Sequence, residues 1–374
     1  MKISFVIITA RDNYPYTGRS DLHVFEPMIE SLRNQTMKGS DFELIIVDVL
    51  YNERKDYFKD LKLPFHVKHI PSAPNLWHEN GLVGICTQYN KGIIYADGEI
   101  IFFTGDGYMF IPEFCERLWK YYTEGYVPLA WYFFDNTFVP ENQRIVNSEP
   151  PFGVSYNMSG YVGKNVNIDS IDHRPLHAFK NDVGNVNKII HNASWEWWFG
   201  CSSAPLEAML KINGFDQRFD GDRMLLDCDV GSRLELAGHD KFGLFKDLFI
   251  VHAQTNRAWS TKAGLTGATS IKCNFPLIHW SRNFNHYIAN DHENIDEDIK
   301  WCKEVYCVKK CSLRNACKKD HPWQYPFEHK AGYGFNCDKK WFDFWRTHQI
   351  KINLTEERNK RISGDEKYKE GTFT

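Results

Sequence analysis

One segment of the chain predicts much of its architecture: YNKGIIYADGEIIFFTGDG, residues 89–107. Its first part has the apolar spacing of a helix that stops at Gly98, and the apolar run at 100–103 is typical of a buried strand. The strand leads to Asp106, which lies between two glycines in a loop. Ligands bind at the carboxyl ends of strands in open α/β sheets. The segment therefore predicts one carboxylate at a binding edge, or, as the alternative, a turn aspartate that caps a helix beginning near Pro112.

The flanking sequence continues the same alternation of strands and helices. The N-terminal half predicts strands at 2–9, 42–47 and 65–70 and helices at 26–33 and 82–95. The second half predicts helices at 206–212 and within 221–238, and a closing strand at 241–251. Alternating elements with short connections predict an α/β fold with a doubly wound, mostly parallel sheet.

Composition limits the possible classes of protein. The chain has 374 residues, 43% of them hydrophobic and 15% aromatic, which suits one large α/β domain with an appendage. A net charge of −3 gives no overall attraction to nucleic acid or anionic membranes. The sequence has no run of 18 apolar residues and no cleavable leader, so we expect no transmembrane segment and a cytoplasmic location with reduced thiols.

The end of the strand resembles a known nucleotide-sugar site. The residues that carry this resemblance are Asn90, Lys91 and Gly92 on the helix, and Thr104, Gly105 and Asp106 at the end of the strand. They are similar to the nucleotide-sugar domain of GT-A glycosyltransferases, especially family 2, where the strand ends in an Asp-x-Asp metal site. Only the second aspartate of that motif, Asp106, is present, because Thr104 replaces the first. The resemblance implies a Rossmann-like GT-A fold that binds Mn²⁺ or Mg²⁺.

The first strand and the second strand supply further residues of the same kind. Thr9, Ala10 and Arg11 follow the first strand, and Asp48 ends the second. They resemble the wall that binds the base and ribose in these enzymes, where a carboxylate accepts hydrogen bonds. The resemblance thus implies that these four residues bind the nucleotide sugar, together with Asn90, Lys91, Thr104, Gly105 and Asp106.

The second half of the chain resembles the acceptor half of the family. The motif Gly214-Phe215-Asp216 precedes Asp227-Cys228-Asp229, similar to a Gly-Phe-Asp element followed by Glu-Asp-x-Asp, with Leu226 at the position of the glutamate. This implies that Asp227 is the general base of an inverting transfer, with Asp229 as the alternative base. His252 resembles the late histidine that completes the metal site with Asp106. An imidazole ligand favours Mn²⁺ over Mg²⁺.

Beyond the resemblance, the sequence predicts two further regions. We expect a GT-A domain at 1–262, with a nucleotide-sugar half at 1–110 and an acceptor half at 111–262. A Cys/His/Trp-rich C-terminal appendage follows at 263–355, and a charged, frayed tail at 356–374. The appendage contains a candidate structural Zn²⁺ site, with disulfides or unligated thiols as alternatives. Its candidate ligands are Cys302, Cys307, Cys311, Cys317 and His321.

Together these features predict a metal-dependent glycosyltransferase. Its donor would be a nucleotide diphosphate sugar, and its acceptor a hydroxyl of a glycan or, as a lesser alternative, of a modified nucleic acid. A basic, aromatic-flanked stretch at 300–320 is consistent with a nucleic-acid contact or with a solvated helix face. The rival interpretations are a non-catalytic sugar- or nucleic-acid-binding protein that keeps the fold, and a nucleotidyltransferase.

Overall fold

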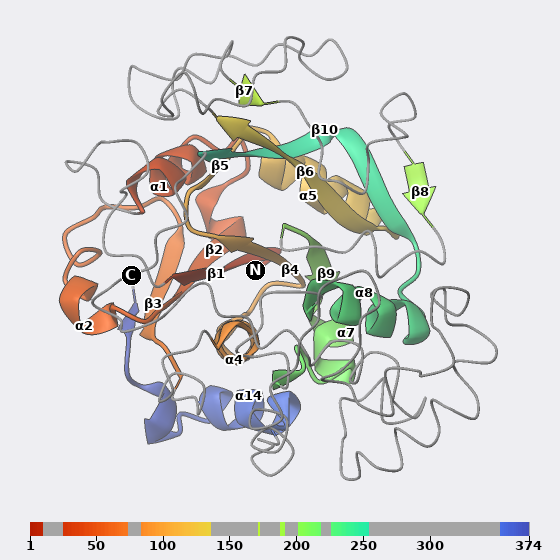
Figure 1. The fold of residues 1–374 in the computed structure, drawn as a ribbon. Helices are drawn as coiled ribbons and strands as arrows, with labels where there is room; N and C mark the ends of the chain where they lie inside the picture. The colour runs from red at the N-terminus through yellow and green to blue at the C-terminus, as the bar shows by residue number, and fades with distance from the viewer. Residues whose placement is uncertain are drawn as a thin grey trace, which may run out of the picture.

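The structure is a computed structural model that describes residues 1–9, 25–73, 84–135, 171–172, 188–190, 201–217, 226–253 and 352–373. These residues form an α/β fold built on two sheets (Figure 1). No helix within these ranges is long and apolar enough to cross a membrane.

The larger sheet has six strands in the order β11-β3-β2-β1-β4-β9. Four central strands run parallel: β1 (Ile3–Thr9), β2 (Phe42–Asp48), β3 (His66–Pro71) and β4 (Ile100–Gly105). The edge strands β9 (Ser203–Pro205) and β11 (Thr372–Phe373) pair antiparallel with β4 and β3. The predicted mostly parallel α/β fold is confirmed.

Helices cover both faces of this sheet, which explains why its strands are continuous apolar runs. All seven residues of β2 are buried. The helix α4 (Ile85–Tyr95) packs on β1 and β2, and α1 (Glu26–Arg33) lies on the opposite side of the sheet (Figure 1). Parallel strands buried on both faces lose the alternation of apolar and polar residues.

The smaller sheet follows the order β5-β10-β6-β7, with β8 also paired to β10. Its strands are β5 (Tyr108–Phe110), β6 (Val127–Asp135), β7 (Ile171–Asp172), β8 (Lys188–Ile190) and β10 (Phe242–Ala253). Helix α5 (Phe114–Thr123) packs on β10 and β6. The other elements before residue 253, within the described ranges, are η2 (Gly39–Asp41), α2 (Tyr51–Arg54), α7 (Leu206–Lys211) and α8 (Leu226–Leu236).

Two local predictions around the opening segment differ from the structure. The helix ends at Tyr95, as the predicted range 82–95 has it, but Gly98 is not its cap, because Gly98 does not have the left-handed backbone of a helix cap. Its role is close packing, because a Cβ there would lie 2.5 Å from the Ser4 backbone nitrogen. The capping alternative for Asp106 is also wrong, since the N-cap of α5 is Glu113.

The expectation of a frayed C-terminal tail is wrong as well. Residues 352–373 form α14 (Leu354–Ile362), η10 (Glu366–Tyr368) and β11. Helix α14 packs against α4, and β11 extends the large sheet (Figure 1). Leu354 is fully buried and Tyr368 is nearly so. The sequence suggested fraying because the segment is highly charged, but the structure pairs many of those charges.

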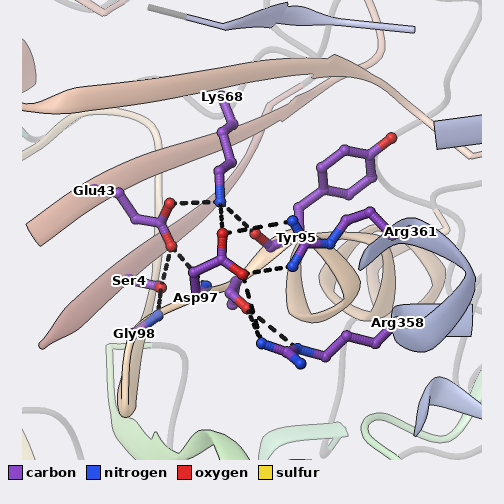
Figure 2. Close-up of polar contacts among 9 residues, drawn as sticks. Ser4, Glu43, Lys68, Tyr95, Asp97, Gly98, Arg358 and Arg361 are labelled. Atoms are coloured by element: carbon purple, nitrogen blue, oxygen red, sulfur yellow. Dashed lines mark hydrogen bonds and ion pairs between the residues drawn. The ribbon is translucent and has the colours of Figure 1, made fainter. Parts of the chain in front are cut away.

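A polar cluster joins this C-terminal segment to the amino ends of the parallel strands (Figure 2). Lys68 Nζ lies 2.7 Å from Glu43 Oε2 and 2.6 Å from Asp97 Oδ2. Arg361 and Arg358 from α14 approach the same Asp97 carboxylate from the other side. Glu43 is almost completely buried, so its charge depends on Lys68 for compensation. The cluster lies at the amino ends of the strands, away from the carboxyl ends where ligands bind. Its role is therefore to stabilise the fold.

The Asp97 carboxylate makes stability depend on pH. Burial raises the pKa of Asp97, but hydrogen bonds from Arg361 and Lys68 outweigh this and hold the pKa below 3.8. Because the folded pKa is depressed, this stabilisation is present above the unfolded pKa of about 3.9 and is lost as pH falls through the folded value. We expect Asp97→Asn to lower Tm at pH 7 and to lower it progressively less toward pH 3.

Thermal unfolding of wild type and variant across this pH range checks the prediction. The matched control is Asp56→Asn, which removes an exposed ion pair with Lys59 and should leave Tm almost unchanged at every pH. A Tm difference for Asp97→Asn that is the same at pH 3 and pH 7 would contradict the assigned linkage.

Candidate functional site

The large sheet has a topological switch point between β1 and β4. From β1 the chain passes to β2 and β3 on one side, and it then returns to place β4 on the other side. In open α/β sheets such a point, at the carboxyl ends of the strands, is where ligands bind. Thr9 ends β1 and Asp106 follows β4, so both predicted residues lie at this position.

The Asp106 carboxylate is held in place by the neighbouring strand. Thr9 Oγ1 donates a hydrogen bond to Asp106 Oδ2 at 2.6 Å, and only 5% of Asp106 is exposed. Gly107 has a φ of +84°, a left-handed conformation that allows the chain to turn from β4 into β5. A nearly buried carboxylate that is held in one orientation is suited to binding a cation.

The backbone brings His252 to the same corner. In the antiparallel pair of β5 and β10, His252 is opposite Tyr108, two residues beyond Asp106. Among the described residues no group of three or more potential ligands surrounds a common point. A carboxylate and an imidazole nevertheless match the donors of a Mn²⁺ or Mg²⁺ site that is completed by substrate phosphates.

Asp227 enters the site from the second half of the chain. It is the second residue of α8 and is partly exposed. Burial raises the pKa of the Tyr89 phenol, and the charges of Cys201, Asp227 and Asp106 raise it further. Both carboxylates are therefore close enough to act on one buried side chain. The predicted base and the predicted metal ligand thus both lie near Tyr89, and Asp229 lies on the same helix as Asp227.

Tyr89 and Cys201 are buried side chains near these carboxylates. The Tyr89 hydroxyl donates to the Thr104 carbonyl oxygen at 3.4 Å, and its ring stacks on Phe215 at 4.9 Å between centroids. Burial raises the pKa of Cys201 to about 12, although hydrogen bonds from Tyr108 and Thr104 oppose the rise. Both groups are thus neutral at pH 7. The sequence analysis did not identify Tyr89 and Cys201 as site residues. The only sequence feature that pointed to either was the aromatic residue directly before Asn90, which is Tyr89.

Two residues predicted to bind the nucleotide sugar, Asp48 and Asn90, have partners inside the protein. Asp48 is fully buried and accepts hydrogen bonds from the Leu50 backbone nitrogen and from Arg54, and it lies 3.0 Å from His69 Nε2. The Asn90 amide pairs with both backbone groups of Phe215, as described further below.

Lys91 is directed toward the C-terminal segment. Burial lowers the pKa of Lys91 to about 8, Glu370 opposes this shift, and Lys367 adds to it. Among the other predicted residues, Thr104 is fully buried and Gly105 continues β4. Ala10, Arg11, and the whole predicted zinc set from Cys302 to His321 lie outside the described residues, so their roles stay predictions.

The requirement for glycine at position 214, in the Gly-Phe-Asp motif, has a clear steric reason. Gly214 has a φ of +67°, and a Cβ would lie 2.3 Å from Asn90 Oδ1 and 2.4 Å from Leu354 Cδ1. We expect Gly214→Ala to lower the free energy of unfolding by about 2–4 kcal/mol, through backbone strain plus overpacking. The control Gly125→Ala, at φ +88° with no atom within 4 Å of the new Cβ, should lower it by only about 1 kcal/mol. Denaturant unfolding measures both, and equal losses would contradict the packing role.

The N-terminal part of this chain matches glycosyl transferase family 2. The family model covers residues 15–174, which include the predicted Asn90-Lys91-Gly92 and Thr104-Gly105-Asp106 motifs. Over these residues the match agrees with the predicted resemblance to family 2 of the GT-A glycosyltransferases, and it supports glycosyl transfer as the general activity.

Solved structures of similar proteins include S. aureus TarS. The structure of TarS 1–349 with UDP has a TM-score of 0.44 and 13% identity, and the match covers 84% of this chain and 74% of that one. The structure with UDP-GlcNAc has a TM-score of 0.47 and 11% identity, covering 87% and 80%. No curated protein matches the chain.

Proposed function

We propose that this protein transfers a sugar from a nucleotide diphosphate sugar to an acceptor hydroxyl, with the help of a divalent cation and with inversion at the anomeric carbon. One observation supports the proposal most directly. Asp106 is fixed by Thr9 at the switch point of the large sheet, the position at which open α/β sheets bind ligands. Such a transfer needs positive charge on the leaving diphosphate and a base for the acceptor hydroxyl, to which Asp106 and Asp227 would contribute.

Asp106 and His252 would hold Mn²⁺ or Mg²⁺. The bound cation would supply positive charge to the diphosphate of the leaving group as the glycosidic bond breaks. The protein contributes orientation, because the hydrogen bond from Thr9 Oγ1 holds the Asp106 carboxylate at the switch point. The strand pairing of β5 with β10 brings the His252 backbone to the same corner.

Asp227 would act as the general base. It is partly exposed, so an acceptor can approach it, and it lies in the first turn of a helix, where a carboxylate is stabilised in its charged form. It would accept the proton of the acceptor hydroxyl as that oxygen attacks the anomeric carbon. Attack from the side opposite the leaving group inverts the configuration. Asp229 is the alternative base.

Purified protein with a panel of nucleotide diphosphate sugars, with and without Mn²⁺, tests the proposal. At a ligand concentration of 100 Kd, the native state should gain about 2.7 kcal/mol, seen as a rise in Tm that requires the metal. Release of the nucleoside diphosphate should accompany hydrolysis or transfer. Binding without turnover would favour the non-catalytic interpretation. Consumption of added pyrophosphate, with formation of a nucleoside triphosphate and a sugar phosphate, would favour a nucleotidyltransferase.

The Zn²⁺ site remains a separate proposal. Elemental analysis of protein purified without chelator should find about one zinc per chain, lost when Cys307 and Cys311 are changed to serine. Finding no zinc in the unmodified protein would end this proposal without affecting the glycosyl-transfer proposal. The acceptor and the cytoplasmic location also remain predictions.

A further inference from the structure

The turn at 212–215, directly after α7, connects three parts of the molecule. Asn213 and Gly214 have φ values of +55° and +67°, two left-handed residues in succession. Asparagine tolerates this conformation better than most residues that carry a side chain. Asn213 is the only non-glycine residue with positive φ in the described parts of the chain, which marks the turn as a site that the surrounding structure has to hold.

Two helices of the site are attached to this turn. The fully buried Arg233 of α8 donates from Nη1 to the Ile212 carbonyl oxygen at 2.7 Å. On the other side, Asn90 of α4 donates to the Phe215 carbonyl oxygen at 2.8 Å and accepts from the Phe215 nitrogen at 2.7 Å. The turn therefore fixes the helix that carries Asp227 relative to the helix that carries Tyr89.

The C-terminal segment is hydrogen-bonded to the turn through the Asn213 side chain. Asn213 Nδ2 donates to the Ile352 carbonyl oxygen at 2.6 Å, and the Leu354 nitrogen donates to Asn213 Oδ1 at 2.9 Å. The fully buried Leu354 side chain packs where Gly214 lacks a Cβ. These contacts join residues 139 and 141 positions apart in the sequence. The start of α14 thus packs directly on the turn that holds α8.

We propose that Asn213 is a positioning residue for the transfer reaction. By clamping residues 352–354 onto the turn, it fixes the position at which α8 presents Asp227 relative to Asp106. This inference rests on the proposed function for its kinetic consequence. Asp106 and Thr9 are held by β4 and β1, so loosening the turn displaces the base and leaves the metal side in place.

The variant Asn213→Gly isolates the clamp. Glycine adopts a φ of +55° without strain, so the backbone is preserved while both side-chain hydrogen bonds are lost. A small misplacement of a catalytic group lowers turnover steeply, and we expect kcat to fall about 10-fold while KM for the donor changes less than about 2-fold. Assays run well below the Tm of the variant, so that the protein is folded.

A matched control loosens the same segment at its other end. Tyr95→Phe removes the hydrogen bond from the Tyr95 hydroxyl to the Tyr368 carbonyl oxygen at 3.1 Å, far along the chain from the turn. It should lower Tm and leave kcat unchanged. Leu354→Ala supplies a second variant at the clamp, and its effect on kcat should be non-additive with that of Asn213→Gly, because both act on one contact.

Hydrogen exchange gives a readout that is independent of activity. In Asn213→Gly the amides of α8 should exchange faster than in the wild type, whereas in Tyr95→Phe they should not. Wild-type kcat together with unchanged α8 exchange in Asn213→Gly would overturn the inference. If the wild type has no transfer activity, the proposed function fails, and the exchange of α8 alone decides whether Asn213 positions this helix.

Discussion

Replacing Asp227 with asparagine is expected to lower kcat by about 10²-fold or more while nucleotide-sugar affinity persists. Asparagine keeps the size and most of the hydrogen-bonding capacity of the side chain but cannot accept the proton of the acceptor hydroxyl. Donor binding should depend on Asp106 and its strand, not on α8. Steady-state kinetics with varied donor, together with the Tm shift caused by the donor, measure the two effects separately.

Asp229→Asn is the matched control for this variant. It removes a carboxylate from the same helix two residues away, and it should reduce kcat less. If Asp229→Asn were the more damaging change, the base would be Asp229 and the mechanism would stand. Full activity in both variants would refute the base assignment, and a product of retained configuration would show that Asp227 has another role.

Replacing Asp106 with alanine is expected to abolish the metal-dependent rise in Tm caused by nucleotide sugars and to lower turnover by about 10²–10³-fold. The variant loses a carboxylate that is 5% exposed and bonded to Thr9, at the switch point of the sheet. The fold should survive, because the side chain lies at the end of a strand and not within the apolar core. Thermal-shift titrations with Mn²⁺ and donor provide the measurement.

Asp48→Asn distinguishes loss of metal binding from general destabilisation. Asp48 is fully buried against Arg54 and His69, so removing its charge leaves Arg54 uncompensated, at a cost of about 3–5 kcal/mol. This variant should unfold more easily yet keep its Mn²⁺ dependence. Unchanged Mn²⁺ dependence in Asp106→Ala would refute the metal assignment.

The sequence predicted the elements that local pattern determines. The β-branched and aromatic runs of β1, β2 and β4 have only one stable environment, a sheet covered on both faces, and their order leads to a parallel sheet. Because strand ends meet at one edge, the approach of Asp106 to Thr9 could also be anticipated. The helix that carries Asp227 was predicted within 221–238 from the sequence pattern, whereas the role of Asp227 came from the resemblance to the family.

Only the tertiary structure decided which protein groups pair with the predicted polar side chains. Asp48 and Asn90 are strand-end and helix residues of the expected kind, yet each is paired inside the protein, with Arg54 and Phe215 respectively. The sequence could not reveal this, since the partners are supplied by other elements. Residues 352–373 illustrate the same limit at long range. Their charges suggest a solvated tail, but Asp97 and Asn213, more than a hundred residues earlier, provide the partners that fold the segment onto the domain.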